Sequence, residues 1–165
     1  MEAVAGIPQA HEAEIACLGA ALIDAEAARV VARNLTSQDF FLTKHQAIWL
    51  AVAGLVERAS PVDRVSVYRE VLRLGQAEQV PPSYLLHLEE SVPTAANLAH
   101  YVGLVKDATL RREARGLGLR LAEQASDPGA DISRILADWS EDTQARLEAS
   151  GRNGGPPVPI ITSLP

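Results

Sequence analysis

Thr43-Lys44-His45-Gln46-Ala47-Ile48-Trp49-Leu50-Ala51-Val52-Ala53-Gly54-Leu55-Val56 is the stretch that decides the fold class of this chain. Its large apolar residues recur at intervals of three and four, which places them on one face of a helix; they are Ile48, Trp49, Val52, Leu55 and Val56. Thr43 and Gln46 have the spacing of a capping box, so we expect the helix to begin there. The stretch predicts an amphipathic helix that packs on a core.

The flanking sequence repeats this pattern in both directions. We expect helices at residues 11–23, after Asp24, between Asp63 and Gly75, and after Pro81-Pro82. Residues 95–125 predict one long helix with Thr94 as its N-cap. Aromatic residues make up only 4% of the 165 residues, and the apolar ones are mostly Ala, Leu and Val. Since Ala and Leu favour helix, the sequence predicts an all-α fold.

A strong turn at Ser126-Asp127-Pro128-Gly129 separates the long helix from a last helix that ends near Ser150. The two helices should form a protruding αα-hairpin with little to pack on within the chain. Its apolar stripes therefore predict an oligomer interface at Leu110, Leu117, Leu121, Ile132, Ile135 and Trp139. We expect a compact helical domain at residues 8–105, the hairpin at 106–149, and a Gly/Pro-rich flexible linker tail at 150–165.

Charge and cysteine content narrow the function classes. The net charge of −6 argues against direct binding of nucleic acid, which normally needs a basic surface. The long helix has a basic side, formed by Lys106, Arg111, Arg112, Arg115 and Arg120. We interpret it as a solvated face paired with carboxylates; the alternatives are contact with an acidic partner and, less favoured, contact with DNA.

Cys17 is the single cysteine, and we find neither a signal peptide nor a long apolar run. We expect a soluble cytoplasmic protein without membrane contact.

No catalytic or cofactor motif is complete. His11-Glu12 begins like a zinc-binding helix, but Ile15 replaces the second histidine, and we expect the histidines to be surface or half-buried residues. Cys17 lies beside the apolar face of its helix and predicts a small buried side chain. Neither Lys44 nor Lys106 stands in the glycine-rich setting of a phosphate-binding loop. We therefore expect no cofactor, no metal and no ATP hydrolysis.

Several short motifs, in order, resemble the opening domain of DnaB-type bacterial replicative helicases. They are Pro8-Gln9 with Glu12-Ala13-Glu14 and Leu18-Gly19-Ala20, then Asp39-Phe40-Phe41, His45, Pro61-Val62-Asp63, Tyr84-Leu85 and Val92-Pro93-Thr94-Ala95-Ala96-Asn97. The last matches the family's V-P-T-A-A-N in full, whereas Pro81-Pro82 replaces the usual Gly-Gly and Phe41 replaces Tyr. Each motif alone is weak, but their order and spacing over residues 8–150 are specific.

The resemblance implies a non-catalytic N-terminal domain whose hairpins pair into a collar above the motor ring, and on which primase and helicase loaders dock. Carried over by position, primase docking falls on Tyr84, Arg115 and Leu121. Arg115 stands where some relatives have an aliphatic residue, and Tyr84 could equally be a packed core residue with Leu121 only a dimer contact. The motor domain is absent from this chain.

Three interpretations remain open from the sequence. The chain is the collar domain of a helicase, as a fragment or a truncated product, and mediates oligomerisation and docking during DNA replication. Alternatively it is a stand-alone phage or plasmid protein that regulates a host helicase or primase. An enzyme with an unrecognised site is the third interpretation, which no motif favours. The apolar Ile160-Ile161 near the end favours the first, since it resembles the approach to a further element.

Overall fold

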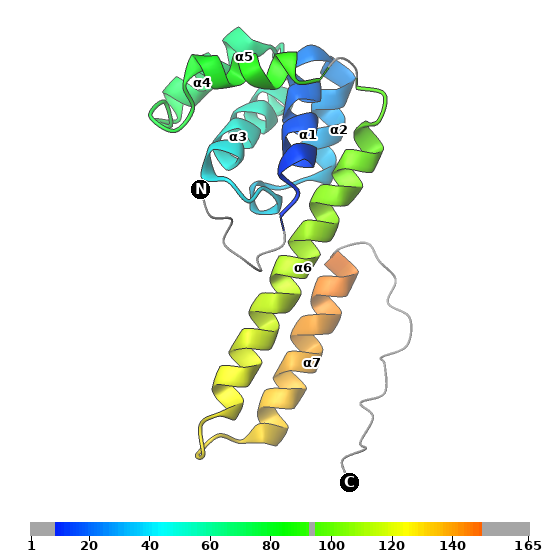
Figure 1. The fold of residues 1–165 in the computed structure, drawn as a ribbon, viewed down its shortest axis with the longest axis vertical. Coiled ribbons are helices and arrows are strands. Elements are labelled where there is room, and N and C mark those ends of the chain that lie inside the picture. Colours follow the sequence, from blue (N-terminus) through cyan, green and yellow to red (C-terminus); the bar gives the residue numbers. More distant parts are fainter. Residues whose placement is uncertain (1–8, 93–94, 150–165) are drawn as a thin grey trace. The chain divides into compact units, whose positions relative to one another are not determined.

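The structure, a computed structural model, describes residues 9–92 and 95–149. Within these ranges it is entirely helical and has no β-strand (Figure 1). The elements are α1 (His11–Ile23), α2 (Ala25–Asn34), the short 3-10 helix η1 (Ser37–Asp39), α3 (Thr43–Glu57), α4 (Arg64–Arg73), α5 (Pro82–Glu90), α6 (Leu98–Ala125) and α7 (Ile132–Ala149). The predicted all-α class is therefore confirmed.

The chain divides into two compact units, Met1–Arg112 and Glu113–Pro165, with the boundary inside α6. In the first unit, α1 packs against α2, α3 and α5, while α3 packs against α2 and α4. The start of α6 closes the same core through Leu98, Val102 and Val105. The second unit contains the C-terminal part of α6 and the whole of α7. The sequence-based division at residue 105 stays a prediction.

Local signals explain where most helices begin and end. Asp24 and Asp63 cap α2 and α4, with their carboxylates accepting hydrogen bonds from the backbone N–H groups of Ala27 and Ser66 at 2.7 and 2.8 Å. Gly75 follows α4 with a φ of 70°, a conformation that favours glycine. These three predictions are confirmed. The expected N-cap Thr94 lies outside the described residues, and α6 begins at Leu98.

The predicted capping box at the start of α3 is wrong. Leu42 is the N-cap of α3 and makes no side-chain cap, while Gln46 donates its Nε2 to the carbonyl oxygen of Phe40 at 2.8 Å. The capping box lies earlier, between Thr36 and Asp39 at η1. Gln46 therefore ties α3 to the preceding loop and leaves the N-terminus of its own helix uncapped.

The apolar face of α3 lies in the core as predicted. Ile48, Ala51 and Val52 are fully buried, whereas Trp49 is only partly buried. Cys17 of α1 is also fully buried, and burial raises the pKa of its thiol to about 12. The thiol thus stays protonated and inert, which confirms the prediction of a small buried side chain.

Gly19 of α1 marks a close approach of α1 to α5 in the first unit. A Cβ atom on Gly19 would lie 2.4 Å from the backbone oxygen of Leu88 and 2.7 Å from Cγ2 of Val92. We expect Gly19→Ala to lower the free energy of unfolding by about 1–3 kcal/mol, because the backbone of α5 must move away. Chemical denaturation of the variant and the parent measures this difference.

Gly103 of α6 provides the matched control for this substitution. A Cβ atom there would meet nothing within 4 Å, so Gly103→Ala should raise stability by up to about 1 kcal/mol through helix propensity alone. Equal stabilisation by both substitutions would show that α1 and α5 are not in close contact.

Candidate functional site

A buried polar network lies between α1, α3 and α5. Nδ1 of His45 lies 2.6 Å from Oε2 of Glu14, and Nε2 of His45 lies 2.6 Å from the hydroxyl oxygen of Tyr84. The second oxygen of Glu14 accepts the backbone N–H of Phe41 at 2.9 Å. Glu14 and His45 are 1% and 0% exposed, whereas Tyr84 is half-buried. The network thus runs from the core to an aromatic ring at the surface.

The protonated phenol of Tyr84 is compatible with one consistent assignment of donors and acceptors in this network. Burial, and then the nearby charge of Glu14, raise the pKa of Tyr84 to about 12, so its hydroxyl stays protonated. The hydroxyl can then donate to Nε2 of His45, which leaves Nδ1 of His45 to donate to the Glu14 carboxylate. These two hydrogen bonds restrict the rotamer of Tyr84.

Lys44 and His87 lie near the ring of Tyr84, and His11 lies against His45 behind it. Nζ of Lys44 lies 3.7 Å from the centre of its ring, which is cation–π geometry. The ring of exposed His87 is 5.9 Å from that of Tyr84, and exposed His11 stacks on His45 at 5.6 Å. Tyr84 therefore presents a fixed, positively flanked aromatic surface.

The prediction that the histidines lie at or near the surface is wrong for His45, which is fully buried. The network as a whole was missed. A signal was present, because Glu14 shares a helix face with Leu18, and His45 shares one with Ile48 and Val52. A polar residue on an apolar face that repeats every three to four residues indicates a buried pair.

A second candidate site lies in the second unit, between the end of α6 and α7. Four predicted interface residues, Leu117, Leu121, Ile135 and Trp139, line one cavity of about 250 Å³ together with polar side chains. Ion pairs join the two helices at its margins: Arg146 to Glu113 at 3.5 Å, and Arg120 to Asp142 at 3.8 Å. The sequence therefore selected side chains that the hairpin brings together.

The remaining predicted residues lie apart from this cavity. Leu110 is half-buried in the first unit, and Ile132 is 42% exposed at the start of α7. Of the predicted docking residues, Tyr84 lies in the first unit, whereas exposed Arg115 and half-buried Leu121 lie in the second. The sequence did not single out Leu119, although it is 56% exposed.

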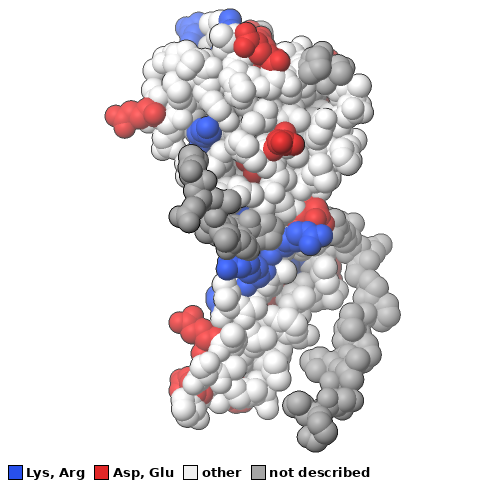
Figure 2. All heavy atoms as spheres, viewed as in Figure 1, with Lys and Arg blue, Asp and Glu red and all other residues white. Residues whose placement is uncertain are grey.

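Charged side chains are paired in several places along α6. Arg111 bonds Asp107 at 2.6 Å, and Arg112 donates to the backbone oxygen of Asp39 at 2.7 Å. On the face shown in Figure 2, both acidic and basic side chains occur among uncharged ones. This pattern agrees with the solvated, paired face expected for the basic side of α6.

Other classes of site find no support in the described part of the chain. Its His, Cys, Asp and Glu side chains form no group of three or more that could hold a metal ion. Of the helices at residues 9–92 and 95–149, none is long and apolar enough to cross a bilayer. What the structure offers is a fixed aromatic surface on one unit and a helical hairpin with exposed apolar residues on the other.

These features define a class of protein, an all-helical domain that continues through a long helix into a second, antiparallel helix. The model of the DnaB-like helicase N-terminal domain matches residues 6–107, and the chain belongs to this family. It is 34% identical over 132 residues to the replicative DNA helicase DnaB of Mycobacterium leprae, and 38% identical over 130 residues to that of Geobacillus stearothermophilus. These matches cover 78% of this chain in both cases, but only 22% and 29% of the relatives.

Solved structures show the same fold. The N-terminal domain of DnaB helicase from Mycobacterium tuberculosis superposes with a TM-score of 0.76 at 30% identity, over 84% of this chain and 98% of that one. The corresponding domain from Helicobacter pylori, whose interactions with primase are described, gives a TM-score of 0.64 at 20% identity, over 77% of this chain and 100% of that one. The resemblance inferred from the sequence is therefore confirmed.

Proposed function

We propose that this chain is the non-catalytic N-terminal domain of a replicative DNA helicase, which mediates self-association and docks the helical C-terminal domain of primase or a helicase loader. The family match carries the proposal. No phosphate-binding loop occurs in the sequence, so we infer that the chain has no ATPase of its own. It would act in the cytoplasm, in DNA replication, through contacts with other proteins.

The hairpin supports self-association. Leu119, Ile132 and Leu136 are 56%, 42% and 43% exposed, so the apolar surface of α6 and α7 is not fully covered within the chain. The indole N–H of Trp139 is covered and finds no acceptor among the described residues. Burial of a Leu-sized side chain contributes about 1.5–3 kcal/mol, and a second copy could supply this burial.

The ring of Tyr84 supports partner docking. Its rotamer is fixed by His45 and Lys44, so little side-chain entropy is lost on binding. The Helicobacter pylori relative interacts with primase. The resemblance drawn from the sequence places primase docking at Tyr84. Exposed Arg115 would require a carboxylate on the partner, which favours the cognate primase over primases of other bacteria.

Calorimetric titration with the cognate primase C-terminal domain tests the docking proposal. We expect Tyr84→Ala to weaken binding by roughly tenfold or more, because a buried aromatic anchor is lost. Tyr84→Phe keeps the ring but removes the donor to His45, so it separates the contact surface from the network behind it. We expect this variant to bind within a few-fold of the parent.

Two outcomes would contradict this role for Tyr84. Equal binding by the parent and Tyr84→Ala would make Tyr84 a packed core residue only, and absence of binding by either would leave the chain with assembly alone. Thermal unfolding must first show that both variants are folded, because the Tyr84 ring also packs against the core.

A stand-alone protein that regulates a host helicase or primase is the second candidate function. The same family match supports this function, because a protein that joins a helicase oligomer through its hairpin needs only this domain. The genomic sequence that follows the codon for Pro165 distinguishes the two: an open frame that continues into a Walker motif indicates the helicase.

A further inference from the structure

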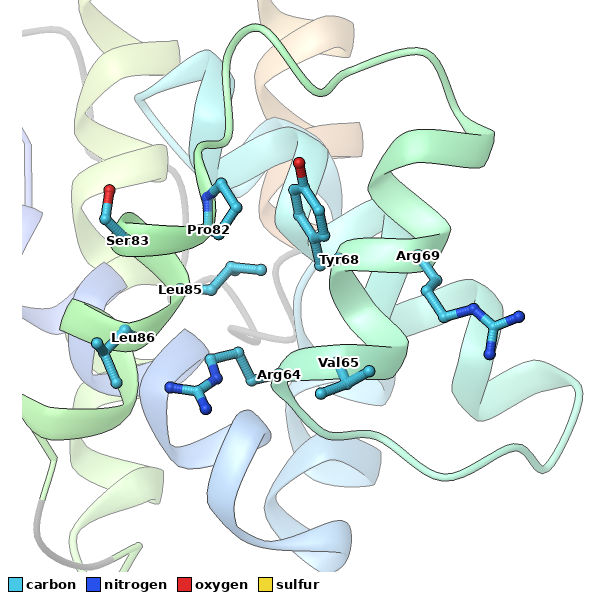
Figure 3. A pocket seen from close by; sticks show the side chains of 8 residues that line it. All are labelled: Arg64, Val65, Tyr68, Arg69, Pro82, Ser83, Leu85 and Leu86. Atoms are coloured by element: carbon cyan, nitrogen blue, oxygen red, sulfur yellow. The ribbon is translucent and has the colours of Figure 1, made fainter.

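A groove between α4 and α5 lies on the side of α5 that faces away from Tyr84. Residues two positions apart on a helix point about 200° apart, so Leu86 and Tyr84 occupy opposite faces of α5. The groove has a volume of about 340 Å³, and its apolar lining includes Val65, Tyr68, Leu85 and Leu86. Figure 3 shows that these side chains come from the two neighbouring helices and that Leu85 points from α5 toward α4.

The apolar side chains of this groove are incompletely covered. Val65 and Leu86 are 65% and 39% exposed, although Leu85 at the floor is fully buried. Two large aliphatic side chains that flank a buried one across neighbouring helices form the kind of groove that accepts an amphipathic helix. A partner helix would cover both of them at once.

The charged side chains that line the groove are all basic. Arg64 lies beside Leu86 and shares a half-exposed ion pair with Glu89 at 3.3 Å. Arg69 lies at the outer margin and makes no ion pair within the described part of the chain. Because Glu89 balances the charge of Arg64, Arg69 carries the unbalanced positive charge at the groove, and it favours a negatively charged occupant.

A second copy of the chain fits the groove poorly. A two-fold interface places the same patch of both copies in contact, so the patch of one copy that carries Arg64 and Arg69 would lie against an equally basic patch of the other. Like charges brought together without water are unfavourable.

We propose that the α4–α5 groove docks an acidic amphipathic helix of another protein. The helix places its apolar residues over Val65 and Leu86, and its carboxylates reach Arg64 and Arg69. This surface is separate from the primase surface proposed at Tyr84, and the domain can hold two partners on one helix, α5.

Fluorescence anisotropy with the full 165-residue chain tests this proposal. The probe is a labelled helical peptide with leucines at intervals of three and four and glutamates at the other positions; its control carries lysines in place of the glutamates. We expect the glutamate peptide to bind more tightly. Val65→Asp combined with Leu86→Asp should weaken its binding by roughly tenfold or more, and Arg69→Glu by roughly two- to fivefold.

Two matched variants make the result specific. Leu72→Asp changes a residue of α4 that is 50% exposed but does not line the groove, and Tyr84→Phe changes the opposite face of α5; neither should alter peptide binding. Equal binding of the two peptides, or unchanged binding by the Val65→Asp and Leu86→Asp variant, would overturn the proposal. Self-association of the parent that this variant abolishes would assign the groove to a second copy instead.

Discussion

Replacement of His45 by leucine is expected to lower the free energy of unfolding by about 3–5 kcal/mol. The carboxylate of Glu14, only 1% exposed, would lose its partner at 2.6 Å and keep only the N–H of Phe41. A charge left unpaired in the interior is among the costliest changes that a single substitution makes. Urea denaturation followed by circular dichroism measures the loss.

Two further variants show whether the pair or the packing is responsible. In the double variant Glu14→Met and His45→Leu the buried carboxylate is absent together with its imidazole partner, so it should be more stable than His45→Leu alone, although Phe41 loses its acceptor. His100→Leu, at an exposed position of α6, should change stability by less than about 0.5 kcal/mol. A loss below about 1 kcal/mol for His45→Leu would contradict the buried network.

Substitution of both Leu121 and Ile135 by aspartate should convert the protein to a monomer while the first unit stays folded. Both side chains line the cavity of the hairpin and are half-buried in the single chain. Since a symmetric dimer would contain four such carboxylates, we expect the dissociation constant to rise at least about a hundredfold. Sedimentation velocity measures the shift, and circular dichroism reports whether the helices remain.

The matched control places the same charge elsewhere on the same helices. Ala122 and Ala137 are exposed, and they neighbour the substituted positions on different helix faces. If aspartates at these two alanines disrupt the oligomer equally, net charge and not the apolar cavity governs assembly. If the Leu121 and Ile135 variant keeps the oligomer of the parent, the interface lies elsewhere, for example at Leu119.

The sequence predicted the helices because their signals are local. Asp24, Asp63 and Gly75 act within three or four residues of themselves, so spacing alone identifies their roles. The capping box predicted at Thr43 was wrong because a local spacing takes no account of contacts outside the helix. Its spacing was correct, but Gln46 found a better acceptor in the loop at Phe40, which no helix pattern reveals.

The candidate site was harder to predict because its contacts are distant in sequence. Glu14 and His45 are 31 positions apart, and His45 and Tyr84 are 39 apart. The family resemblance pointed to Tyr84, but it did not explain what holds the Tyr84 ring in place. Glu14 and His45 each share a helix face with apolar residues, but only the packing of α1, α3 and α5 shows that they meet.

Gly19 shows what a short motif can conceal. Leu18-Gly19-Ala20 contributed to the resemblance only as a string of letters, whereas the structure gives the glycine a physical reason, the backbone of Leu88 at 2.4 Å from a Cβ. Nothing near position 19 in the sequence predicts that approach, because Leu88 belongs to α5.

Sedimentation of the parent chain over a range of concentrations, alone and with the cognate primase C-terminal domain, tests most directly whether this domain acts through contacts between proteins. We expect the average mass to rise above the 17.6 kDa of one chain as concentration increases, and a larger species that contains both proteins to form in the mixture. A mass of 17.6 kDa at every concentration, with no complex in the mixture, would contradict both assembly and docking.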